Sequence, residues 1–418
     1  MIEIRDTSVP IVVLQLTPWT LHHGGLGIAR TAGRLGVRVY WAHAHRQFSP
    51  VALSRYVCGR RFCDAAAPAE TSVEHLLEWG RQIGSEPILI PVDDRAAIFV
   101  ADQAEALRER FLFPKQPVGL TRALSSKKEM HYLCRNMGVP TPAAAFPQSK
   151  DDVATFVETA VFPVVLKRIL DWPPEHWMQR ESVTIVSTPE ELLEEYENSE
   201  TLGKPNLMLQ EYIPGGPEDV WMFNGFFTDS SDCLIGFTGK KIRQRPPFTG
   251  ATTLGICLHN HTVRRMATEF LQRIGYRGIV DMGFRYDRRD GQYKLLDVNP
   301  RVGSTFRLFV DSNGVDVVRA LYLHLTGQPV KRGSFCEGRK WIVEPSDLLT
   351  SLRYCRMGKL TPIGWMRSFR GIEEGAWFAA DDPLPFAVMC CTSLVKSVYK
   401  LRGRTKAACV ARLGRELP

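Results

Sequence analysis

The chain has 418 residues, of which 44% are hydrophobic and 23% are charged. This composition excludes a disordered chain, and the length allows two or three globular domains. No apolar run approaches the roughly 20 residues that a membrane-spanning helix needs, and the opening MIEIRDTSVP carries acids where a secretion signal has an apolar core. We therefore expect a cytoplasmic protein. Its ten cysteines include no CxxC pair, which predicts reduced thiols rather than a disulfide framework or a zinc site.

The formal net charge of +8 is unevenly distributed along the chain. Residues 331–418 hold 16 Lys and Arg against 8 Asp and Glu, whereas residues 1–330 hold 37 of each sign. Basic residues gathered at one end favour contact with an acidic surface. The body of the chain is balanced and carries no nucleic-acid-binding motif, so we expect no nucleic acid partner.

The first part of the chain has the pattern of an α/β domain. PIVVLQL, residues 10–16, predicts a buried strand, GGLGIARTAGRLG and then VRVYWA predict a helix and a second strand, and PILIPVDD predicts a further strand that ends in acids. The glycines depart from the dinucleotide pattern GxGxxG because position 30 is Arg. This departure favours helix packing and disfavours a nicotinamide-dependent oxidoreductase. The prolines of LFPKQPVGL mark the end of the unit.

The segments that follow carry charged residues at the ends of strands and helices. SSKKEMHYLCRNMGVPTP predicts a helix with a Ser cap that is stopped by Gly and Pro. FPVVLKRI predicts a buried strand with Lys167 at its end, and LMLQEYIPGGPEDVWMFNGFF predicts a strand, a turn and another strand. GFTGKKIRQRPPFTGATTLG predicts a strand and then a basic, proline-rich loop, and TVRRMATEFLQRIGYRG predicts an amphipathic helix.

The stretch GIVDMGFRYDRRDGQYKLLDVNPR predicts a β-hairpin, because both arms alternate with period two around the polar turn DRRDG. Pairing that is symmetric about Arg289 places Asp281 opposite Asp297. Like charges at that position are destabilising unless a cation lies between them. Asn299 points to the same side, and two carboxylates with an amide oxygen suit Mg²⁺. The alternative is a solvated hairpin face with an arginine as counterion, and a bulge would change the register.

Lysines, glutamates, a basic loop and the motif Asp-x-Asn follow one another in a definite order between residue 115 and about residue 325. This order resembles the ATP-grasp superfamily, and the basic loop and DVNPR are most similar to the D-aspartate ligase group and the carbamoyl-phosphate synthetase type. The resemblance implies an α/β and α+β fold in four parts. These are an N-terminal Rossmann-like pre-ATP-grasp domain at 1–114, a small ATP-grasp lobe at 115–205, a large lobe with the metal and phosphate site at 206–330, and a basic C-terminal extension at 331–418.

The resemblance also implies a nucleotide site. Lys127, eleven residues before the Gly of GVPTP, matches the first nucleotide lysine of the family, although Ser126 stands where many members have Asp. Lys167 matches the second lysine, which reaches the α and β phosphates of ATP. By the same resemblance, Glu211 would contact the adenine amino group, and the backbone of Tyr212 and Ile213 would contact the edge of the adenine ring. Glu218 would accept hydrogen bonds from the ribose hydroxyls.

The site of phosphoryl transfer is implied in the same way. In similar enzymes a basic residue neutralises the γ-phosphate. Lys241 or Arg243 matches that residue, and the two share a face if the segment is extended. Arg301 resembles the arginine that holds the substrate carboxylate or the acyl phosphate, with the backbone of Gly303 and Ser304 close to it. The Mg²⁺ ligands, with Mn²⁺ as the alternative ion, correspond to Asp281, Asp297 and Asn299.

The function implied is that of an ATP-dependent carboxylate–amine ligase. A small-molecule carboxylate attacks the γ-phosphate of ATP, and an amine then displaces phosphate from the acyl phosphate. The alternative is a catalytically idle Mg-ATP-binding protein that regulates or is recruited to a membrane. Family members are often homodimers. The end of the chain, DPLPFAVMCCTSLVKSVYKLRGRTK, is compatible with a peripheral membrane segment or with a last helix followed by a solvated tail.

Overall fold

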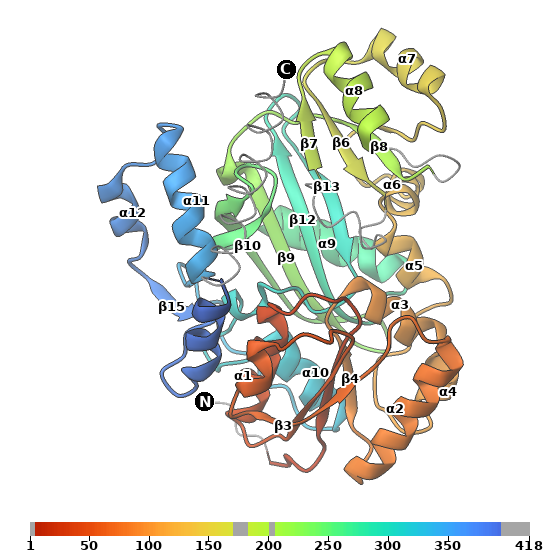
Figure 1. Ribbon diagram of the computed structural model, residues 1–418, viewed down its shortest axis with the longest axis vertical. Helices are drawn as coiled ribbons and strands as arrows, with labels where there is room; N and C mark the ends of the chain where they lie inside the picture. The colour runs from red at the N-terminus through yellow and green to blue at the C-terminus, as the bar shows by residue number, and fades with distance from the viewer. Residues whose placement is uncertain (1–4, 170–182, 200–204, 394–418) are drawn as a thin grey trace, which may run out of the picture.

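The computed structural model describes residues 5–169, 183–199 and 205–393. Its strands form three sheets, and Figure 1 shows the N-terminal sheet at the bottom, the largest sheet in the centre and the third sheet at the top. The arrangement confirms the predicted fold class, an N-terminal parallel α/β unit followed by a two-lobed α+β unit. Among the described residues, no helix combines the length and the apolar content that crossing a membrane requires.

The N-terminal sheet is parallel and has the order β3-β2-β1-β4. Its elements are β1 (Ile11–Gln15), α1 (His23–Gly33), β2 (Val39–His43), η1 (Pro50–Leu53), β3 (Val57–Phe62), α2 (Ala69–Ile83), β4 (Ile88–Pro91), α3 (Asp94–Asp102) and α4 (Ala104–Leu107). The apolar run of β1 is buried on both faces, because Val13 packs into the core that includes α1 while Val12 packs into the core that includes α2. A Cβ at Gly27 would lie 3.0 Å from the Phe306 ring, which confirms that these glycines serve helix packing.

The third sheet has the order β5-β8-β6-β7 and is antiparallel. The elements of this part are α5 (Leu120–Ser125), α6 (Lys127–Asn136), β5 (Ala144–Ala145), α7 (Lys150–Thr159), β6 (Val164–Arg168), β7 (Val183–Val186), α8 (Pro189–Ser199) and β8 (Leu207–Glu211). Ser126 caps α6 as predicted, since its side chain accepts a hydrogen bond from the Glu129 amide. The Lys127 amide donates to the carbonyl oxygen of Ile169 over 3.2 Å, which ties the start of α6 to the end of β6.

The central sheet has seven strands in the order β13-β12-β9-β10-β11-β14-β15. They are β9 (Val220–Phe227), β10 (Cys233–Arg245), β11 (Ala251–Cys257), β12 (Gly278–Asp287), β13 (Gln292–Asn299), β14 (Lys340–Ile342) and β15 (Ile372–Gly375). The helices and turns of this part are η3 (Pro217–Asp219), α9 (His261–Arg273), η4 (Phe306–Leu308), α10 (Val317–Leu325), α11 (Glu344–Arg356) and α12 (Pro362–Ser368).

The predicted hairpin is formed by β12 and β13, but its predicted register is wrong. Asp281 lies opposite Asn299, and Asp297 lies opposite Gly283. Two shifts cause the difference. The pairs beside the turn, such as Asp287 with Gln292, are already one residue away from symmetry about Arg289, and a register shift between Gly283 and Phe284 adds a second residue on the β13 side. The two carboxylates are therefore diagonal neighbours on one face rather than a directly opposed pair.

The segment from residue 331 onward was expected to be an extension, yet its described part belongs to the central sheet and returns to the N-terminal unit. Strand β14 pairs antiparallel with β11, and β15 pairs parallel with β14. After β15 the chain packs against α1, where Arg30 donates from Nε to Oδ2 of Asp382 over 3.0 Å and both side chains are buried. Asp382 also accepts from the Ser54 hydroxyl over 2.7 Å. The basic end predicted beyond residue 393 lies outside the described residues.

Candidate active site

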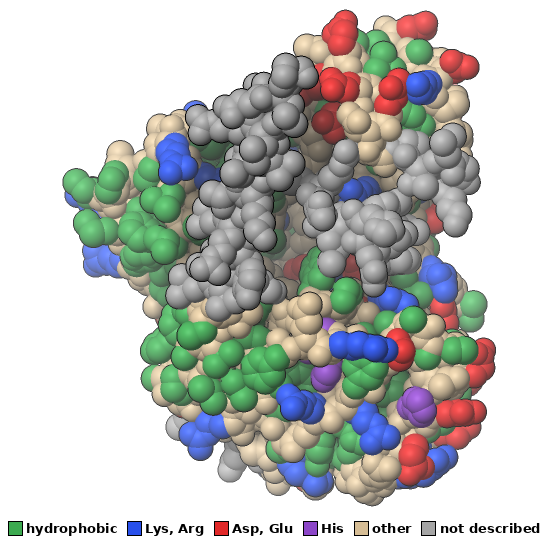
Figure 2. All heavy atoms as spheres, viewed as in Figure 1, with side chains coloured by type: hydrophobic (Ala, Val, Ile, Leu, Met, Phe, Trp, Pro, Cys, Tyr) green, Lys and Arg blue, Asp and Glu red, His purple; other side chains and the backbone are tan. Residues whose placement is uncertain are grey.

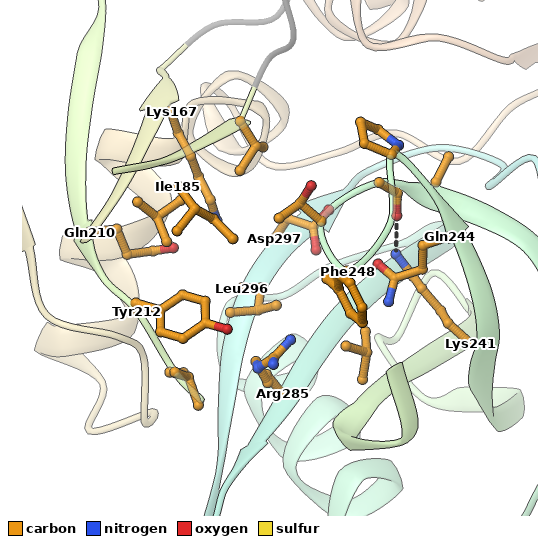
Figure 3. Close-up of a pocket in the computed structure, with 18 of the residues that line it drawn as sticks. Lys167, Ile185, Gln210, Tyr212, Lys241, Gln244, Phe248, Arg285, Leu296 and Asp297 are labelled. Atoms are coloured by element: carbon orange, nitrogen blue, oxygen red, sulfur yellow. Dashed lines mark hydrogen bonds between the residues drawn. The ribbon is translucent and has the colours of Figure 1, made fainter. Parts of the chain in front are cut away.

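A cavity of about 450 Å³ opens between the third sheet and the central sheet. Its walls come from β6, β7 and β8 on one side and from β10, β13 and the loop at 246–250 on the other (Figure 3). Seven of the twelve residues singled out in the sequence line it, although they come from five separate segments of the chain: Lys127, Lys167, Glu211, Tyr212, Ile213, Lys241 and Asp297. Glu218 and Arg243 instead line an adjoining cavity that shares Tyr212 and Lys241 with the first.

Two lysines enter the cavity from the third-sheet side. Lys127 is the first residue of α6, and Lys167 is the penultimate residue of β6, opposite Val183 of β7. The backbone hydrogen bond between Lys127 and Ile169 holds these two chain segments side by side. Both ammonium groups are thus carried by regular elements rather than by loops, which suits the fixed binding of phosphate oxygens.

The edge of the cavity is formed by the end of β8. The Glu211 carboxylate is held by the hairpin turn of the central sheet, because it pairs with Arg289 and lies 3.5 Å from Nζ of Lys294. Tyr212 and Ile213 follow directly, and Figure 3 shows the Tyr212 ring directed into the cavity. Glu218, the middle residue of η3, is exposed and lies 3.7 Å from Arg288.

Lys241 and Arg243 of β10 do not share a face, contrary to prediction. The β10–β11 register shifts between the two residues, so that Lys241 and Gln244 face the cavity while Arg243 faces α11. Arg243 makes a buried, bidentate ion pair with Asp347, with both N–O distances 2.7 Å. The structure therefore favours Lys241 over Arg243 as the cation available to a phosphate.

Lys241 lines the cavity from the central-sheet side. It donates to the carbonyl oxygen of Gly250 over 3.2 Å, which links β10 to the loop at 246–250 (Figure 3). Burial lowers the pKa of Lys241, whereas the charges of Asp297 and Asp281 act in the opposite direction. Lys241 thus lies within electrostatic reach of both carboxylates of the hairpin.

Two glycines leave room for the carboxylates of Asp281 and Asp297, because a side chain at either glycine would collide with one of these acids. A Cβ at Gly283 would lie 2.2 Å from Oδ1 of Asp297, and a Cβ at Gly303 would lie 2.5 Å from Cγ of Asp281. Burial and then the charge of Asp297 raise the pKa of Asp281 to about 6. The two acids therefore lie close enough to repel each other in a buried site.

Asn299 and Arg301 connect this acid pair to the N-terminal unit. The Asn299 amide donates to Oδ2 of Asp281 over 3.4 Å, and its oxygen accepts from Arg301 over 3.2 Å. Arg301 also donates from Nε to Oδ1 of Asp94, the first residue of α3, over 2.7 Å. Gly303, which follows Arg301 by two residues, lies against Asp281.

Phe248 and Arg285 line the cavity but were not singled out from the sequence. Phe248 has φ of 71°, a backbone conformation that non-glycine residues seldom adopt, and its ring contacts Tyr354 of α11 at a centroid distance of 5.4 Å. Arg285 donates to the carbonyl oxygen of Gly215 over 2.7 Å and so holds the hinge after β8. The prolines and glycines around Phe248 predicted a loop, but no local pattern indicated the direction of its side chain.

Comparisons with known proteins were made against families, curated proteins and solved structures. No family model matches the chain. A D-aspartate ligase from Enterococcus faecium is 23% identical over 308 residues, covering 70% of this chain and 72% of the relative. An L-amino acid ligase structure from Bacillus licheniformis superposes with a TM-score of 0.59 at 16% identity, covering 79% of each chain. The chain has the ATP-grasp fold.

A further solved structure agrees with this ATP-grasp assignment. N5-carboxyaminoimidazole synthetase from Staphylococcus aureus, complexed with ADP, superposes with a TM-score of 0.60 at 11% identity and covers 85% of this chain and 89% of its own. At such low identity the similarity establishes the ATP-grasp fold, and the chemistry must be argued from the residues of the cavity.

Proposed function

We propose that this ATP-grasp protein is an ATP-dependent ligase that activates a small-molecule carboxylate as an acyl phosphate and couples it to an amine. The observation that carries the proposal is the convergence of Lys127, Lys167, Lys241 and Asp297 on one cavity from four distant segments. Three ammonium groups beside a carboxylate pair suit a polyphosphate accompanied by a divalent cation.

The acid pair fits a magnesium or manganese site. The described residues contain no group of three or more His, Cys, Asp or Glu side chains that could hold a metal by itself. Asp281 and Asp297 with the Asn299 amide instead supply a partial set of hard oxygen ligands, and burial together with the charge of Asp297 raises the pKa of Asp281. These three residues would hold the ion together with phosphate oxygens, and the ion would neutralise charge on the phosphates.

The protein's own groups then have distinct tasks in the reaction. Lys127 and Lys167 bind and orient the phosphates, and Lys241 neutralises the γ-phosphate as its bond to ADP breaks. A substrate carboxylate oxygen forms the new bond to phosphorus, and ADP leaves. Arg301, oriented by Asp94, holds the carboxylate or the acyl phosphate in the second step, in which the amine forms the C–N bond and phosphate departs.

Amino acids are the favoured substrate class. The similarity of this chain to a D-aspartate ligase over 70% of its length supports this choice, as does the fold that the chain shares with an L-amino acid ligase. The adenine and ribose contacts proposed for Glu211, Tyr212, Ile213 and Glu218 place the nucleotide base at the hinge after β8. The reacting end would then lie toward Asp297 and the N-terminal unit.

The experiment that tests the proposal measures ADP release from the purified protein with Mg-ATP, alone and with panels of D- and L-amino acids. The matched variants are Lys241→Met, which removes a cation that lines the cavity, and Asp290→Asn, which changes an exposed acid that pairs with Lys294 in the turn of the β12–β13 hairpin. Substrate-dependent ADP release that Lys241→Met abolishes and Asp290→Asn preserves supports the ligase. Tight Mg-ATP binding without turnover on any substrate mixture would favour the idle regulatory alternative instead.

A further inference from the structure

Helix α11 has its polar side toward the protein and its apolar side toward solvent. Its buried residues are Asp347, Thr350, Ser351 and Tyr354, three of which are polar or charged. Its exposed large residues are Leu348, Leu349 and Leu352, each about half exposed. A helix of a globular protein normally buries its apolar stripe, so this inversion needs a partner for the outer face.

The apolar surface continues from α11 over the following turn and α12. We define the α11–α12 face as the exposed apolar side chains Leu348, Leu349, Leu352, Met357, Ile363, Met366 and Phe369. Figure 2 shows this group of hydrophobic side chains over α11 and α12, with basic side chains among them and at the margin. Single exposed apolar residues are ordinary, but seven on two successive helices and the residues that directly follow them form a patch of the kind that marks a binding surface.

The charge of the face decides what it can bind. From residue 348 to residue 372 the chain contains no Asp or Glu. The same stretch carries five exposed cations, Arg353, Arg356, Lys359, Arg367 and Arg370. An apolar surface interspersed with cations alone is complementary to an anionic, partly apolar partner.

Two other occupants are disfavoured by charge. A second copy of the chain, related by a twofold axis, would place the same five cations against themselves. The C-terminal residues 394–418 contain seven Lys and Arg and one Glu, so that segment repels the face as well. A bilayer with anionic headgroups attracts both.

We propose that the α11–α12 face binds the surface of an anionic lipid bilayer. The leucines, Met366 and Phe369 enter the boundary between headgroups and acyl chains, while the arginines and Lys359 contact lipid phosphates. The docked surface adjoins the catalytic region, since Tyr354, Lys359 and Leu360 line the same cavity as Glu218 and Lys241. The enzyme would thus work with one side of its nucleotide site close to the membrane.

Vesicle co-sedimentation of the full chain tests the proposal, with vesicles of phosphatidylcholine alone and of phosphatidylcholine mixed with phosphatidylglycerol. The test variant combines Leu348→Ser, Leu352→Ser and Met366→Ser. The matched control combines Phe48→Ser, Val118→Ser and Val161→Ser, three apolar residues that are half exposed or more and lie outside the face. Thermal melting and Mg-ATP binding of each variant establish that it is folded.

We expect binding only to the anionic vesicles, weakened at an ionic strength of about 0.5 M, about tenfold weaker in the test variant, and unchanged in the control. A wild-type protein that stays in the supernatant overturns the proposal. So does equal binding by test variant and wild type, which would assign the binding to another segment. A dimer in light scattering that the test variant dissociates would show that the face is an interface between two copies, and would likewise overturn it.

Discussion

Replacing Asp297 by Asn should stabilise the ligand-free protein while it destroys the proposed metal site. Asp281 has its pKa raised from 3.8 to about 6, which corresponds to a cost of about 3 kcal/mol for its ionised form in the folded state. Burial is the larger cause and the charge of Asp297 the second. Asp297→Asn removes only the second, so we expect about 1 kcal/mol of added stability near neutral pH.

The sign of the effect depends on pH in a defined way. A carboxyl whose pKa is raised by folding destabilises the protein above that pKa, and the cost disappears as pH falls toward the unfolded value of 3.8. The gain from Asp297→Asn should therefore be complete at about pH 7.5 and nearly absent at about pH 4.5. Urea unfolding in the presence of a chelator measures both values, with Asp290→Asn as the control that should change stability by less than about 0.5 kcal/mol.

With Mg-ATP bound, the wild type should become more stable than Asp297→Asn. A ligand at about 100 times its Kd stabilises the folded state by about 2.7 kcal/mol, and only the wild type keeps the full ligand set. The reasoning is refuted if Asp297→Asn is less stable than wild type without ligand at neutral pH, or if its gain persists unchanged under acidic conditions. Either result would mean that the two carboxylates do not repel each other across this site.

Three further substitutions test other contacts of the site. Arg243→Met should lower the free energy of unfolding in urea by about 3–5 kcal/mol, because it leaves the Asp347 carboxylate buried without its cation. Adding Asp347→Leu should recover about half of that loss, and equal stability of the single and double variants would contradict a tight pair. Gly283→Ala should displace the Asp297 carboxylate and lower kcat about 100-fold with little change in Tm, and normal turnover would show that the close approach is unimportant. Phe248→Ala should raise the KM for ATP about 2- to 10-fold, measured by ADP release, since its aromatic contact with α11 is lost.

The fold could be predicted because its main elements carry strong local patterns. The run of β1 is apolar except for its last residue, Gln15, the arms of the β12–β13 hairpin alternate over most of their length, and Ser126 precedes a helical pattern. The order of charged residues along the chain then indicated which strand and helix ends belong to one site. These are properties of single segments or of their order along the chain, so one amino-acid sequence is enough to recognise them.

The departures arise where the outcome depends on two segments at once. The bulge after Gly283 changed the predicted register because it depends on how the two strands pair, which alternation within one strand does not specify. The direction of Arg243 was missed because its partner Asp347 lies about a hundred residues further along the chain. The contribution of the chain after residue 331 was missed because β14 and β15 are short strands with weak patterns of their own.

The return of the chain to α1 makes its two ends interdependent. Arg30, Ser54 and Asp382 form one buried set of contacts, so the N-terminal unit folds with part of its surface supplied by residues more than three hundred positions later. A shortened gene that stops at residue 330 would remove the Asp382 carboxylate and the Trp377 carbonyl oxygen that Arg30 binds. A chimaera that exchanges only the first 114 residues with a relative would separate Arg30 and Ser54 from Asp382. Recombination or engineering within this architecture should therefore transfer the first and last segments as a pair.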